Sequence, residues 1–172
     1  MKKKKIFIII AVYWLVIFAG LIAFKEFTLR TGTEVLLESR PVDPRDLFRG
    51  DYVALAYKIG VINYALLNGQ SFADGDRIYV LLRIDENGKG IPVAVSKNRP
   101  KEGVFIKGTV VNRRPRYDNN LEVVYGIESY FVPEGTGRDI EKNIEDVYTK
   151  VVVDAFGHAV IKSLVVNGKE VK

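Results

Sequence analysis

The stretch "DYVALAYKI", Asp51–Ile59, carries the pattern on which the predicted fold rests. Every second residue of it is a candidate for one apolar face: Val53, Leu55, Tyr57 and Ile59. Because successive side chains of a strand point to opposite faces, this alternation indicates a strand with one face in the core. Tyr52 falls on the other face, where packing gives no reason for an aromatic residue.

Similar runs, rich in β-branched and aromatic residues and separated by turn motifs, follow along the chain. We expect further strands at Thr33–Ser39, Asp76–Ile84, Ile91–Ser96, Val104–Val111, Leu121–Val132, Val147–Asp154 and His158–Val166. Two short helical segments are expected, at Gly137–Asp146 and in "NYALLNGQ", residues 63–70. The sequence therefore predicts a mainly β protein, with a barrel- or sandwich-like domain of about eight strands.

The N-terminus has a different pattern. Ile6–Phe24 is a run of 19 residues without a charged side chain, and four lysines, Lys2–Lys5, precede it. As a helix this run would rise about 28 Å, close to the hydrocarbon thickness of a bilayer. It is longer than the apolar core of a cleaved signal peptide, so we expect an uncleaved anchor. The lysines should stay cytoplasmic, which makes residues 1–24 the anchor and residues 25–172 an extracytoplasmic domain of a cell-membrane protein.

The charge of the chain reflects this anchor rather than a binding surface. The 172 residues carry a formal charge of +5, but without Lys2–Lys5 there are 22 basic residues against 21 acidic ones. This balance argues against a nucleic-acid partner. The chain has no cysteine, which excludes disulfides, thiol catalysis and cysteine-bound metal.

Upstream of Tyr52, the stretch "RPVDPRDLFRG" has the chemistry of a capped turn. Asp43 suits a helix N-cap, Pro44 the first helical position, and Gly50 the left-handed residue that ends such a turn. The predicted turn and strand therefore do not explain the residue type at four positions. These are Arg45, Arg49, Asp51 and Tyr52.

"RGDYVALAY" resembles the signature of the GDYXXLXY family, with Gly50, Asp51, Tyr52, Leu55 and Tyr57 at the expected spacing. The likeness extends upstream through "VDPRDLFRGDYV" and downstream to "YGIESYFVPEGTGRDIE", Tyr125–Glu141. The resemblance implies a short, membrane-anchored bacterial protein, of a kind often encoded beside multi-span membrane proteins. It suggests an integral membrane partner and supplies no catalytic residue.

The downstream stretch "ESYFVPEGTGRDIE" allows two interpretations. The first is a strand, a turn and a helix cap, with Glu128 and Tyr130 on the outer face of the strand. In the second, these residues form an interaction patch with the side chains left unexplained above, since arginine and tyrosine are frequent at interface hot spots. This patch would comprise Arg45, Arg49, Asp51, Tyr52, Glu128, Tyr130, Glu134 and Arg138. It requires that the two stretches meet in space.

Three functional classes remain open. The favoured one is a binding or accessory domain without catalysis, cofactor or metal. An envelope hydrolase would instead use Asp51 with Glu128 or Glu134, and a small-ligand sensor would need an apolar pocket with polar anchors. His158, the single histidine, is expected at a hairpin turn rather than in a metal site.

Overall fold

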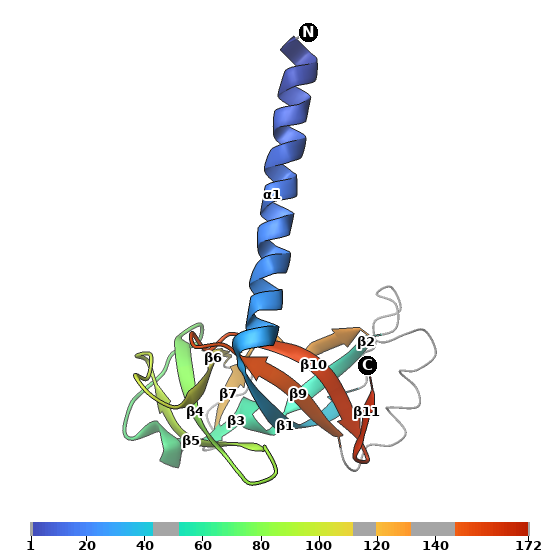
Figure 1. Ribbon diagram of the computed structural model, residues 1–172. Helices are drawn as coiled ribbons and strands as arrows, with labels where there is room; N and C mark the ends of the chain where they lie inside the picture. The colour runs from blue at the N-terminus through green and yellow to red at the C-terminus, as the bar shows by residue number, and fades with distance from the viewer. Residues whose placement is uncertain (1, 43–51, 112–119, 132–146, 172) are drawn as a thin grey trace.

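The computed structural model describes residues 2–42, 52–111, 120–131 and 147–171, in which a long helix stands on a domain of two β-sheets (Figure 1). The helical elements are α1 (Lys2–Thr31) and two short 3-10 helices, η1 (Lys58–Gly60) and η2 (Tyr64–Leu67). The strands are β1 (Thr33–Val42), β2 (Tyr52–Tyr57), β3 (Val61–Asn63), β4 (Arg77–Ile84), β5 (Gly90–Ser96), β6 (Val104–Val110), β7 (Asn120–Val124), β8 (Ser129–Phe131), β9 (Val147–Val153), β10 (Ala159–Val166) and β11 (Lys169–Val171). The predicted fold class, an apolar N-terminal helix followed by a mainly β domain, is confirmed.

Helix α1 is long and apolar enough to cross a membrane, and its apolar part is not covered by the domain. It runs further than the uncharged segment Ile6–Phe24, because Lys25–Thr31 continues the same helix. An ion pair between Arg30 Nε and Glu26 Oε1 at 2.8 Å joins successive turns of this last part. The anchor and the domain are therefore joined by helix rather than by a loop.

The end of α1 is fixed against β9 and β10. Thr28 is fully buried there, and the Gly32 amide donates to the Thr28 carbonyl at 2.9 Å. A side chain at Gly32 would collide with its surroundings, since a Cβ atom would lie 2.6 Å from Val152 Cγ1 and 2.7 Å from the Val153 carbonyl oxygen. This close packing sets the position of the helix relative to the sheet.

Six strands form the sheet beside α1, in the order β11-β10-β9-β1-β2-β8, and all neighbours are antiparallel. The other sheet has five strands in the order β3-β7-β6-β4-β5. The two sheets meet at the β4–β5 turn, where the Leu36 amide donates to the Gly88 carbonyl at 2.8 Å. They share one core, to which Leu37, Ile62 and Ile106 contribute fully buried side chains.

The strand predicted at Asp51–Ile59 is confirmed only to Tyr57, where β2 ends, because Lys58 and Ile59 lie in η1. Leu55, Tyr57 and Ile59 are buried in this core, as predicted, whereas Lys58 is exposed and the side chain of Val53 lies outside the described residues. The segment "NYALLNGQ" is also helical, as η2, with the Asn63 side chain accepting from the Ala65 amide at 2.8 Å. It ends at Asn68, whose positive φ of 49° breaks the helix before Gly69.

The predicted strand Leu121–Val132 is wrong in one respect, because the structure divides it into β7 and β8. Between them Gly126 takes a φ of +79°, a conformation that favours glycine and interrupts the extended chain. The eleven strands of the described residues include three short ones, β3, β8 and β11, that the prediction of about eight did not separate. The expected helix at Gly137–Asp146 and the capped turn at Asp43–Gly50 lie outside the described residues.

Candidate functional site

The two motif stretches that the sequence analysis singled out meet at one edge of the six-stranded sheet. Strand β2 pairs with β8, which places Tyr52 opposite Phe131, Val53 opposite Tyr130 and Ala54 opposite Ser129. The Leu55 amide then donates to the Glu128 carbonyl at 2.8 Å and continues this ladder. Residues about 75 positions apart in the chain are therefore direct neighbours.

Two buried tyrosines link the same stretches, because the hydroxyl of each one bonds to a backbone carbonyl of the other stretch. The Tyr57 hydroxyl, at the end of β2, donates to the Ile127 carbonyl at 2.6 Å. The Tyr125 hydroxyl, after β7, donates to the Ile59 carbonyl at 2.5 Å. We call Tyr57 and Tyr125 the tyrosine pair. Each hydroxyl provides the hydrogen-bond donor for a carbonyl close to the other tyrosine in the chain. The pair therefore holds the turn between β7 and β8 against the end of β2.

Burial keeps both hydroxyls protonated, as donation requires. Desolvation raises the pKa of Tyr125 well above its usual range, and the nearby Glu128 carboxylate raises it further. Desolvation is also the main cause that raises the pKa of Tyr57, although its hydrogen bond with Thr149 acts in the opposite direction. The tyrosine pair is thus a neutral, structural element at physiological pH.

A short row of buried hydroxyls continues from Tyr57 into the sheet. Ser39 Oγ lies 2.9 Å from Thr149 Oγ1, and Ser39 Oγ also donates to the Val147 carbonyl at 3.3 Å. Both residues are buried, on β1 and β9. These contacts satisfy polar groups that would otherwise destabilise the core.

Glu128 has a local structural role. Its Oε1 accepts a hydrogen bond from the Tyr125 amide at 2.5 Å, which closes the turn that Gly126 opens. The side chain is partly buried beside the tyrosine pair. Glu128 therefore lies in the turn between β7 and β8, and not on the outer face of a strand as the sequence analysis predicts.

The predicted outward position of Tyr130 is wrong. Tyr130 is partly buried and packs against the core, whereas Ser129 is exposed. The alternation was extrapolated through Tyr125–Glu128, but that segment is a turn, so the order of faces changes before β8 begins. Tyr130 is therefore better explained by packing than by contact with a partner.

The other members of the predicted patch are only partly placed. Arg45, Arg49, Asp51, Glu134 and Arg138 lie outside the described residues, and so does the side chain of Tyr52. Residues 43–51 run up to Tyr52 and residues 132–146 continue from Phe131, and these two residues are paired.

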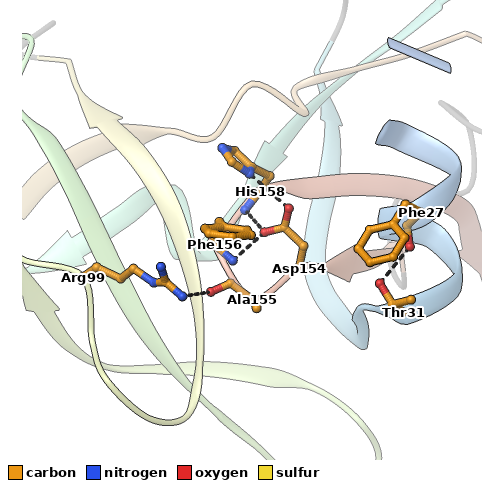
Figure 2. Close-up of polar contacts among 7 residues, drawn as sticks. All are labelled: Phe27, Thr31, Arg99, Asp154, Ala155, Phe156 and His158. Atoms are coloured by element: carbon orange, nitrogen blue, oxygen red, sulfur yellow. Dashed lines mark hydrogen bonds and ion pairs between the residues drawn. The ribbon is translucent and has the colours of Figure 1, made fainter. Parts of the chain in front are cut away.

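A second group of side chains, which the sequence analysis did not connect, lies at the β9–β10 turn (Asp154–His158) beside α1 (Figure 2). The His158 ring is 5.7 Å from the Phe24 ring of α1, measured between centroids. The Arg99 guanidinium lies 4.7 Å from the centroid of Phe156, and its Nη2 donates to the Ala155 carbonyl at 2.9 Å. Phe156 itself remains 56% exposed.

Asp154 organises this turn. Its Oδ1 accepts from the amides of Phe156 and His158 at 2.8 and 2.9 Å, and its Oδ2 lies 3.0 Å from His158 Nδ1. Desolvation alone would raise the pKa of Asp154, but the hydrogen bonds from His158 and Phe156 outweigh it and lower the pKa below its usual value. His158 is at a hairpin turn, as predicted. The sequence "DAFGH" signals the turn but not its contact with α1.

An open cleft of about 330 Å³ lies next to this turn. Among the residues that line it are Lys107, Tyr125 and His158. Within the described ranges, no three or more histidine or acidic side chains are grouped so as to hold a metal ion. Of the described residues that line the cleft, Lys107, Thr109, Tyr125 and His158 have polar side chains and none has a carboxylate.

Comparison with known proteins gives one match. The model of the GDYXXLXY protein family matches residues 14–164, from the middle of α1 to near the end of β10. No curated protein and no solved structure matches the chain.

Proposed function

Since the chain belongs to the GDYXXLXY family, we propose that it is a membrane-anchored accessory subunit that binds an integral membrane protein. Ile6–Phe24 of α1 would hold it in the bilayer, with Lys2–Lys5 on the cytoplasmic side. The β domain would then lie on the extracytoplasmic side of the cell membrane. Catalysis forms no part of this proposal.

The observation that carries the proposal is the pairing of Tyr52 with Phe131. It brings to one sheet edge the attachment points of both segments that hold the unexplained charged residues. Arg45, Arg49 and Asp51 precede β2, and Glu134 and Arg138 follow β8. Arginine and aromatic residues are the types found most often at protein-binding sites.

The role of Glu128 also favours binding over hydrolysis. The hydrolase alternative needs two carboxylates that face a substrate, and Glu128 instead accepts from the Tyr125 amide within a turn. Its remaining candidates, Asp51 and Glu134, are outside the described residues. No observation in the described part of the chain favours the hydrolase over the accessory subunit.

Copurification of the full-length tagged chain from its native membrane in mild detergent tests this proposal. We expect a multi-span membrane protein to copurify with the unmodified chain and to be lost with Arg49→Ala or Tyr52→Ala. Arg83→Ala and Tyr64→Ala are matched controls, because both side chains are exposed on other elements. A chain that purifies alone, or a partner retained equally by all four variants, would contradict the proposal.

A further inference from the structure

The β9–β10 turn lies at the level on α1 where the apolar segment ends. Phe24 is the last residue of the 19-residue uncharged run, and its ring contacts His158 of the turn. A helix of that length spans about 28 Å, so its final residue falls near the boundary between acyl chains and headgroups. The turn is therefore placed where a bilayer surface would be.

This placement is fixed by packing rather than by a loose linker. Thr28 is buried against the sheet, and Gly32 allows the helix end to approach Val152 and Val153 closely. Helix α1 contacts both β9 and β10, the strands that the turn connects (Figure 1). When the helix is inserted, the turn has to approach the same leaflet.

The turn also has the chemistry of the interfacial region. Phe156 projects an exposed aromatic ring, and the guanidinium of Arg99 lies against that ring and bonds to the turn at Ala155. At the headgroup–acyl boundary an apolar phenylalanine ring can enter the acyl region. An arginine beside it can lay its apolar stem along the same region and keep its charged head at the phosphates. The hydrogen bonds to Asp154 hold the turn in one conformation, so contact with a bilayer would cost little conformational entropy.

An exposed phenylalanine alone would need no explanation. Phe156 differs because three observations coincide: its exposure, the cation stacked on it, and the contact of its turn with the last apolar residue of α1. Together they select one occupant for this surface, the lipid bilayer that α1 enters.

We propose that the β9–β10 turn docks on the bilayer, with Phe156 inserted at the headgroup–acyl boundary and Arg99 beside the lipid phosphates. This inference rests on the proposed membrane anchoring of α1 but not on a protein partner. The docked turn would fix the orientation of the β domain on the membrane, so that the β2–β8 edge is presented to a partner in a constant direction.

Fluorescence quenching by brominated lipids tests the proposal on the full-length chain in proteoliposomes. Trp14 is the sole tryptophan and lies within the apolar segment, so the unmodified protein reports insertion of α1. In a Trp14→Phe background, Phe156→Trp reports on the turn. Tyr64→Trp in the same background is the matched control, because Tyr64 is an exposed aromatic of η2, in the part of the chain that contacts β5.

We expect shallow brominated lipids to quench the indole of the Phe156→Trp variant, and its emission to shift to the blue on reconstitution. The Tyr64→Trp variant should show neither change, and Trp14 should be quenched most strongly by deeply brominated lipids. Quenching of Trp14 together with an unquenched, solvent-like signal from Phe156→Trp would overturn this inference and leave the anchor intact. An unquenched Trp14 would overturn the anchoring itself, and with it both proposals.

Discussion

The tyrosine pair and the β9–β10 turn both combine aromatic rings with hydrogen bonds to backbone carbonyls, but they differ in exposure. Tyr57 and Tyr125 are 5% and 9% exposed, and each hydroxyl has its acceptor inside the protein. Phe156 is 56% exposed, although its turn is equally well bonded. An aromatic residue in a signature motif can therefore be structural, while one in an ordinary hairpin turn can be the candidate contact.

The largest expected effect comes from filling the space under the tyrosine pair. In Gly108→Ala, the new Cβ would lie 2.4 Å from Val123 Cγ1 and 3.0 Å from the Tyr125 ring. We expect a loss of about 3 kcal/mol in the free energy of unfolding, since overpacking forces neighbours out of position. Pulse proteolysis of the full-length protein in urea would measure it.

Gly75→Ala is the control for this substitution. An added Cβ at Gly75 has no atom within 4 Å, so only the positive φ of 82° opposes the alanine there. Its cost is that of backbone strain without overpacking, about 1 kcal/mol. A Gly108→Ala variant no less stable than Gly75→Ala would contradict close packing under the tyrosine pair.

The next effect comes from removing one hydroxyl of the tyrosine pair. Tyr125→Phe leaves the buried Ile59 carbonyl without its donor, and Tyr57→Phe does the same to Ile127. Each should lower the free energy of unfolding by about 2 kcal/mol, because a buried acceptor is left unsatisfied. Tyr79→Phe, on β4, is a matched control with an expected change below about 0.5 kcal/mol. If both variants matched this control, the pair would not hold the two stretches together.

A smaller and pH-dependent effect is expected at the β9–β10 turn. Because hydrogen bonds lower the pKa of Asp154 in the folded state, its contribution is present above the unfolded pKa and is lost as the pH falls through the folded value. Asp154→Asn should reduce stability by about 1 kcal/mol near neutral pH. As the pH falls below the pKa of an unfolded aspartate, about 4, the difference from the unmodified protein should shrink. Urea unfolding of both proteins from neutral pH to below this pKa checks the sign, and a difference that grows on acidification would contradict it.

The smallest effect on stability is expected at Phe156. Phe156→Ser should change the free energy of unfolding by less than about 0.5 kcal/mol, because the ring is mostly exposed and the turn is held by Asp154. Urea unfolding in detergent would measure it beside Tyr57→Phe. A loss as large as that of Tyr57→Phe would mean that Phe156 is structural, and the contrast between the two regions would disappear.

Local pattern was sufficient to predict much of the fold. Alternation identified Leu55 and Tyr57 as core residues, and both are buried. The uncharged run Ile6–Phe24 predicted a helix, although that helix continues beyond the run to Thr31.

The candidate site is formed by contacts between residues far apart in the chain, which the alternation of apolar residues does not predict. The hydrogen bond from Tyr57 to Ile127 joins residues 70 positions apart, and strand order decides it. Tyr130 was assigned to the wrong face because the turn at Gly126 interrupts the alternation. Phe156 could not be identified from the sequence as a candidate contact residue, since nothing in its turn indicates that Phe24 lies close to His158.

The central claim is that the two motif stretches meet where β2 pairs with β8, and an engineered disulfide tests it most directly. The chain has no cysteine, so Ala54→Cys with Ser129→Cys introduces the sole thiols, at positions directly opposite across the two strands. Opposed positions of an antiparallel pair have Cα atoms about 4.5 to 5.5 Å apart, within the range that a disulfide spans. We predict rapid formation of an intramolecular disulfide in the folded, full-length protein, and none for Ala54→Cys with Ala94→Cys on β5. Thiols at positions 54 and 129 that stay open to alkylation under oxidising conditions would contradict the account.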